Sequence, residues 1–263
     1  MFCAFASNIR ILGIYLPILT AIFYFFQEKN NKQISFFKFT IIFFSLYFVI
    51  LYLIWPFLWL NPIDNFFLIL RESALYPNHW NFKTLYLGNY LNPENIPWHY
   101  FFVWFTFTTP ILYLLFILFG LFLFLKNYLK FFLKINLNNI ISLWSEASQK
   151  THLFIFCNFF IPIFFVITLN STLYNGWRHL FFLYPFLIYL SIYGIHWVSK
   201  FIDLKIYKLI IFMLIGQTIS NIYFIYKSHP VQNIYFNFIV KDFITENMPI
   251  DYWGLANKKT IDF

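Results

Sequence analysis

Long blocks of apolar residues separated by short polar segments organise this chain. They cover residues 9–26, 36–58, 100–125, 153–169, 180–198 and 207–226. Each block approaches the roughly 20 residues that a helix needs to cross a hydrocarbon core. Because lipid offers the backbone no hydrogen-bond partner and the blocks do not alternate apolar with polar residues, the pattern predicts helices rather than barrel strands. The expected fold is an all-α polytopic membrane bundle of about six transmembrane helices.

The segment 59–99 has a different pattern. Apolar residues recur there at helical spacing, as at Ile63, Phe67 and Leu70, with charged residues such as Asp64 and Arg71 between them. This spacing predicts a short helix lying in the membrane interface, followed by turns that lead into the third span. The expected organisation is a transmembrane bundle over residues 1–226, with 59–99 as an outer loop, and a polar tail over 227–263.

Composition narrows the class of protein. The chain is 61% hydrophobic and only 11% charged, and its mean hydropathy is +0.67, which excludes an ordinary water-soluble domain. Its 41 Phe and 19 Tyr indicate a general residue bias and do not indicate a cofactor site. The net charge of +8 comes largely from lysines in short segments between the apolar blocks. Membrane topology explains these lysines, so no nucleic-acid partner is expected.

The distribution of basic residues predicts the orientation. Lysines concentrate in the segments after the first, third and fifth blocks: Lys29, Lys32, Lys38, Lys126, Lys130, Lys134, Lys150, Lys200, Lys205 and Lys208. Since lysine and arginine accumulate on the cytoplasmic side, these segments are predicted to be cytoplasmic. Both termini, the loop 59–99 and the tail are then extracytoplasmic.

A polar and aromatic cluster, Tyr174-Asn175-Gly176-Trp177-Arg178-His179, lies between two apolar blocks. A guanidinium at a bilayer boundary is suited to clamp the phosphate of a lipid head group. Arginine, tryptophan and tyrosine also gather at membrane boundaries for solvation alone, so a simple interfacial anchor is the alternative. The same two readings, phosphate ligand and snorkelling side chain, apply to Arg10 near the outer end of the first block.

The remaining candidates for chemistry are weaker. Acids such as Asp64 and Glu72 show no spacing that pairs them for general-base catalysis, and the solvated face of a helix explains them better. The histidines show no metal-ligand spacing, and the two cysteines, Cys3 and Cys157, form no disulfide framework. We therefore expect no metal and no cofactor.

Several motifs together resemble bacterial members of glycosyltransferase family 39, which are membrane enzymes related to protein mannosyltransferases and aminoarabinose transferases. The motifs occur in the family's order: Asn8-Ile9-Arg10-Ile11-Leu12-Gly13, Asn95-Ile96-Pro97-Trp98-His99-Tyr100, Thr108-Thr109-Pro110, Asn175-Gly176-Trp177-Arg178-His179 with Tyr184-Pro185, and Ile250-Asp251-Tyr252-Trp253-Gly254-Leu255. The resemblance implies a protein of the bacterial inner membrane that transfers a sugar from a polyprenyl-phosphate donor to an extracytoplasmic acceptor.

The resemblance also implies roles for particular residues. Arg178 and Arg10 are the expected ligands of the donor phosphate. The candidate lining residues of the site are Trp177, His179, Trp98, His99, Tyr252 and Trp253. Membrane lipid and the polyprenyl-phosphate-linked sugar are the expected partners.

One departure from the family matters. Its acidic catalytic residues lie in an outer loop well upstream of the Arg-x-Leu-Gly element, which begins here at Arg10. The resemblance therefore predicts a partial transferase whose catalytic residues are unknown and which is expected to be inactive alone. The alternative is a non-catalytic membrane protein, such as a lipid-binding subunit that works with a separately encoded N-terminal catalytic half. A transporter is less favoured, because no predicted span carries an ionisable residue near its centre.

Overall fold

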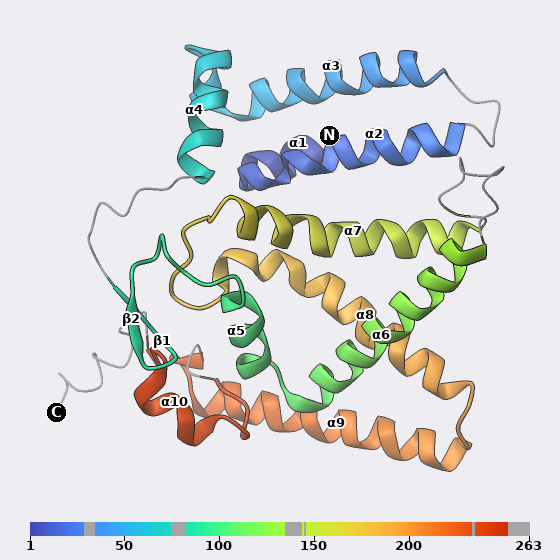
Figure 1. Ribbon diagram of the computed structural model, residues 1–263, viewed down its shortest axis with the longest axis vertical. Coiled ribbons are helices and arrows are strands. Elements are labelled where there is room, and N and C mark those ends of the chain that lie inside the picture. Colours follow the sequence, from blue (N-terminus) through green and yellow to red (C-terminus); the bar gives the residue numbers. More distant parts are fainter. Residues whose placement is uncertain (29–34, 75–82, 135–143, 145, 233–234, 252–263) are drawn as a thin grey trace. The chain divides into compact units, whose positions relative to one another are not determined.

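The computed structural model describes residues 1–28, 35–74, 83–134, 144, 146–232 and 235–251, and most of them are helical (Figure 1). Five described segments are long and apolar enough to cross a membrane: Phe36–Ile54, Ile111–Leu129, Ala147–Thr168, Arg178–Ser199 and Leu204–Lys227. The predicted first span corresponds to a shorter apolar helical segment, Ile11–Gln27. The all-α polytopic class of fold is therefore confirmed.

The chain divides into two compact units, which are described separately. Unit 1 comprises Met1–Pro77 and Lys130–Ser171, and unit 2 comprises Asn78–Leu129 and Thr172–Phe263. The predicted boundary between bundle and tail, at residue 226, falls inside unit 2. The tail belongs to this unit because its described part packs on the helix that begins at Tyr100.

In the described part of unit 1, helices pack around two apolar clusters, one containing Tyr47 and Leu51 and the other containing Tyr15 and Phe23. Its elements are α1 (Phe2–Ile9), η1 (Ile11–Ile14), α2 (Tyr15–Glu28), α3 (Phe36–Ile54), η2 (Pro56–Leu58), α4 (Pro62–Ala74) and α7 (Ala147–Thr168). Buried hydroxyl groups connect them: Tyr47 on α3 donates to Ser7 Oγ on α1 at 2.9 Å, and Tyr15 on α2 donates to Asn158 Oδ1 on α7 at 2.9 Å. Such bonds are favoured between membrane helices, where lipid satisfies no polar group.

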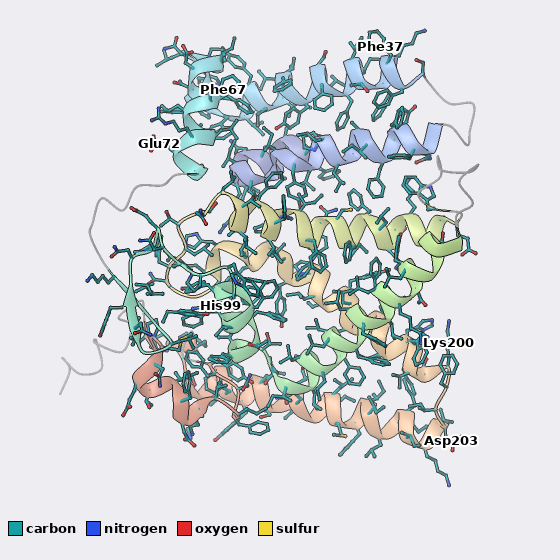
Figure 2. All side chains as sticks on the ribbon, in the orientation of Figure 1. Phe37, Phe67, Glu72, His99, Lys200 and Asp203 are labelled. Carbon is teal, nitrogen blue, oxygen red and sulfur yellow. The ribbon has the colours of Figure 1, made fainter. Side chains whose placement is uncertain are left out.

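The helix predicted in the outer loop is present as α4. It has Asp64 in its first turn and Arg71 in its last turn, which complements the helix dipole. Apolar Ile63 and Phe67 are exposed, and Phe67 and Glu72 both project from this helix (Figure 2). The prediction that the segment forms an amphipathic helix is confirmed; its location in the membrane interface stays a prediction.

Unit 2 contains the other transmembrane candidates, together with a short hairpin and several shorter helices. Its elements are β1 (Thr84–Tyr86), β2 (Asn89–Leu91), α5 (Tyr100–Thr108), most of α6 (Ile111–Lys134), η4 (Arg178–Leu183), α8 (Tyr184–Ser199), α9 (Leu204–Lys227) and α10 (Lys241–Asn247). In the membrane part, α6 crosses α8 closely. A Cβ built on Gly120 would lie 1.9 Å from the carbonyl oxygen of Leu190, so only glycine allows this approach.

The predicted third span, 100–125, is divided into two helices. Helix α5 ends at Thr108, Thr109 is extended with φ −98° and ψ 133°, and α6 begins at Ile111. Pro110 explains the break, because proline has no N–H to donate and forces the preceding residue out of the helical region. Prolines elsewhere in the apolar helices differ in effect, since Pro162 lies inside α7 while Pro185 lies in the first turn of α8.

A two-stranded hairpin was not predicted from the sequence. Strands β1 and β2 pair in antiparallel register, with Thr84 opposite Leu91 and Tyr86 opposite Asn89. Leu87 and Gly88 form the turn with positive φ angles of 48° and 79°. Strands of three residues are too short to show a reliable alternation, and Leu-Gly is not a strong turn signal.

Candidate functional site

The polar cluster 174–179 folds as a sharp turn that leads into a membrane helix. Asn175 and Gly176 have positive φ angles of 55° and 75°, and helical structure begins at Arg178 with η4 and continues into α8. Glycine and asparagine adopt the left-handed region most readily, which explains their place in this turn. The reversal leaves Trp177 buried and Arg178 partly exposed.

Trp177 joins this turn to α5. Its indole Nε1–H donates to Thr108 Oγ1 at 2.9 Å, and the Thr108 hydroxyl donates in turn to the Trp104 carbonyl at 2.7 Å. The rings of Phe101 and Phe105 meet the indole edge-on at 5.8 and 5.7 Å between centroids. Because both its ring and its polar atom are engaged, Trp177 fixes the backbone that carries Arg178.

Arg178 packs on two neighbours from the same turn. Its guanidinium carbon lies 4.7 Å from the centroid of the Tyr174 ring, and Nε approaches His179 Nε2 at 3.4 Å. The rings of Tyr174 and His179 are themselves 4.8 Å apart. Stacking on an aromatic face orients a guanidinium without neutralising its charge. The turn therefore presents an oriented cation at the start of a candidate transmembrane helix.

The hairpin and the start of α5 bring a second predicted motif close to this turn. Tyr100 is 1% exposed, its ring packs 4.9 Å from that of Tyr86, and its hydroxyl lies near the backbone of Gly176. Its neighbour His99 bonds through Nδ1 to the Tyr86 hydroxyl at 2.7 Å, while Trp98 is 66% exposed. The structure thus brings Tyr100, the residue after Trp98 and His99, close to Gly176 of the 174–179 turn.

Arg10 lies in unit 1, at a corner between α1 and η1. Its backbone is extended, with φ −145° and ψ 124°, and its side chain is exposed. The chain turns back so tightly here that a Cβ on Gly13 would lie 2.7 Å from the backbone of Ala6. This close approach explains the glycine of the Arg-Ile-Leu-Gly motif. Binding of one phosphate by Arg10 and Arg178 together stays a prediction.

Other predicted residues are placed as follows. Tyr252 and Trp253 lie outside the described residues, which end at Asp251. In the described ranges no group of three or more His, Cys, Asp or Glu side chains could hold a metal ion. Cys3 and Cys157 are free thiols in unit 1.

Sequence reasoning missed two residues that shape the site. Asn237, 5% exposed, donates its backbone N–H to the Phe107 carbonyl and its side-chain Nδ2–H to the Thr106 carbonyl, at 2.9 and 2.6 Å. It thereby caps the end of α5. Tyr86 fixes His99. Neither residue has a sequence signal, since Asn237 bonds backbone that is distant along the chain and Tyr86 lies in a hairpin that was not predicted.

Comparison with models of protein families, with curated proteins and with solved structures found no match for this chain. The resemblance to glycosyltransferase family 39 stays a prediction made from the sequence motifs.

Proposed function

We propose that this membrane protein binds the phosphate of a polyprenyl-phosphate-linked sugar at Arg178, as part of the extracytoplasmic sugar transfer typical of glycosyltransferase family 39. One observation carries the proposal: the guanidinium is stacked 4.7 Å from the Tyr174 ring at the first residue of the candidate span Arg178–Ser199. A cation at the end of a span lies at the depth of lipid head groups, where it meets phosphate.

The chemistry of this arrangement suits a leaving phosphate. When a sugar leaves a polyprenyl-phosphate donor, negative charge develops on the phosphate oxygens. Arginine stabilises that charge with parallel N–H donors held in one plane, and an oriented donor contributes more than a mobile one. Arg178 supplies the donors, while Tyr174 and the buried Trp177 supply the orientation. No carboxylate of the chain is assigned as the catalytic base. The proposal therefore includes a partner protein that supplies this carboxylate.

The orientation in the bacterial inner membrane is part of the same proposal. Lys200 and Asp203 lie in the connection between α8 and α9, at the end of α8 opposite to Arg178 (Figure 2). Lys205 and Lys208 follow in the first turns of α9. Because basic residues favour the cytoplasmic side, this end is proposed to be cytoplasmic and the Arg178 end extracytoplasmic.

Photo-crosslinking tests the proposed binding. The chain in nanodiscs is labelled with a photoreactive polyprenyl-phosphate analogue, and Arg178→Ala is compared with Arg71→Ala, which removes an arginine from α4 in unit 1. The expected result is strong loss of label for Arg178→Ala and unchanged label for Arg71→Ala. Arg178→Lys keeps the positive charge but loses the planar pair of guanidinium donors, so its labelling is expected to lie between those of the two alanine variants. Equal labelling of intact protein and Arg178→Ala, or no labelling of either, refutes the proposal.

A further inference from the structure

A hydrogen-bonded pair of residues, Tyr86 and His99, lies between the hairpin and the start of α5. The Tyr86 hydroxyl and His99 Nδ1 are 2.7 Å apart, and their rings are tilted by 32° with centroids 5.7 Å apart. Tyr86 is 2% exposed, whereas His99 is partly exposed and lies at the beginning of α5 (Figure 2). A buried group thus holds one nitrogen of a ring that reaches the surface.

The burial of Tyr86 decides the direction of this hydrogen bond. A buried hydroxyl hydrogen needs an acceptor, and His99 Nδ1 is the hydrogen-bond partner of Tyr86 in the part of the chain that the structure describes. Burial raises the pKa of Tyr86 to about 12, so the phenol keeps its proton near neutral pH. Nδ1 therefore accepts, and the neutral imidazole carries its own proton on Nε2.

The hairpin that carries Tyr86 is held in place by the tail. The Gly88 N–H donates to the Asn247 carbonyl at 3.0 Å, and the Leu87 N–H reaches Met248 Sδ at 3.5 Å. Met248 is 1% exposed, so the tail end of α10 is itself packed. These contacts fix the position of Tyr86 before any ligand arrives, and they thereby fix the His99 ring.

Tyr100 connects the segment of His99 to the turn that carries Arg178. Tyr100, the residue after His99, packs on Tyr86 with its ring and lies near the Gly176 backbone with its hydroxyl. Gly176 is two residues before Arg178. His99 therefore precedes the tyrosine that approaches Gly176, and Arg178 follows Gly176 by two residues; both side chains are partly exposed.

We propose that Tyr86 orients His99 so that its Nε2–H donates a hydrogen bond to an anionic oxygen of the phosphate group that Arg178 binds. This inference rests on the proposed function and adds a second, neutral donor to it. Among the described residues, Nε2 of His99 has no hydrogen-bond partner of its own. The competing explanation is purely structural, namely that the Tyr86–His99 bond only fastens the hairpin to α5.

Two substitutions at His99 separate these explanations, because asparagine and glutamine each imitate one ring nitrogen. His99→Asn keeps a polar atom near Nδ1 for Tyr86 and loses Nε2. His99→Gln places an amide nitrogen near Nε2 and loses the atom that Tyr86 bonds. The probe is a short-chain polyprenyl phosphate titrated into the full chain in phosphatidylcholine nanodiscs, and the melting temperature of each variant is measured alongside.

If His99 contacts the ligand, His99→Asn is expected to raise the dissociation constant about tenfold, which is the usual effect of losing one hydrogen bond to a charged group. The melting temperature is expected to stay unchanged. His99→Gln is then expected to lose less affinity and more thermal stability. Unchanged affinity of His99→Asn, with the probe still bound by the intact protein, overturns the inference and leaves the Arg178 proposal standing.

The Arg178→Ala variant, measured in the same way, distinguishes the two proposals. If His99→Asn weakens binding and Arg178→Ala does not, the role of His99 is supported and the proposed role of Arg178 fails. If the intact protein does not bind the probe, both fail. Competition by inorganic phosphate at concentrations similar to that of the probe would assign the site to free phosphate, which supports the His99 contact but refutes the lipid donor.

Discussion

Asn237 offers the sharpest test of how the site is assembled. It joins the segment after the last span to the broken end of α5, where Pro110 leaves backbone carbonyls without helical partners. Its side-chain Nδ2 donates to the carbonyls of Thr106 and Thr109 at 2.6 and 3.2 Å, and its Oδ1 is buried without a partner among the described residues. The perturbation is Asn237→Ala, with Asn237→Asp as an isosteric comparison.

The expected change in the free energy of unfolding follows from these hydrogen bonds. Asn237→Ala removes two hydrogen bonds and leaves one buried and one partly buried carbonyl oxygen without this donor, which together cost about 3 kcal/mol. It also removes the unpartnered Oδ1 of the wild type, which returns about 1 kcal/mol. The expected net loss in the free energy of unfolding is about 2 kcal/mol. Asn237→Asp keeps the shape but sets a carboxyl oxygen against the two carbonyls, so it is expected to cost more than the alanine variant.

Reversible unfolding of the detergent-solubilised protein, followed by circular dichroism, measures this difference. Because α5 holds Trp177 through Thr108, both variants should also bind the polyprenyl-phosphate probe more weakly than the intact protein. The reasoning is refuted if Asn237→Asp is as stable as the intact protein, since that result would mean that the amide does not face the α5 carbonyls.

Three further variants probe close contacts elsewhere. Gly120→Ala should destabilise the protein by at least about 2 kcal/mol, because the added methyl collides with the Leu190 carbonyl on α8; a neutral change in unfolding would contradict the close crossing. Trp177→Phe removes the indole bond to Thr108, so about 1 kcal/mol of stability and part of the probe affinity should be lost, and unchanged values in both assays would argue against its anchoring role. Gly13→Ala should lower the melting temperature, since its methyl meets the backbone of α1; an unaltered melting curve would show that the corner at this residue is not so tight.

Several elements could be predicted from local pattern alone. The apolar blocks around α3, α7, α8 and α9 are long enough that the need to satisfy the backbone in lipid leaves only a helix. The amphipathic spacing of Ile63 and Phe67 was sufficient to predict α4. Helix ends were less predictable, as the early start at Arg178 shows, because the polarity of a residue does not reveal whether its backbone is helical.

The candidate site was predictable in part. The grouping of Tyr174, Trp177, Arg178 and His179 is visible in the sequence because these residues are adjacent. The burial of Trp177 was not visible, because it depends on Thr108 of a helix whose end was predicted at the wrong place. A tryptophan near a membrane boundary is consistent with either a lipid-facing or a packed side chain until its partner is known.

The sequence by itself determined that this is a helical membrane protein and where its polar turns lie. The length of an apolar segment and the positions of charged residues are local properties, and they decide directly which segments partition into lipid and which into water. Only the tertiary structure decided which polar groups meet. Tyr86 bonds His99, Asn237 caps α5 and Trp177 bonds Thr108. Each contact joins residues that are separated along the chain and come together only through the fold. Each of these bonds forms because a buried donor or acceptor must find a partner, and which partner it finds depends on the packing of the whole unit.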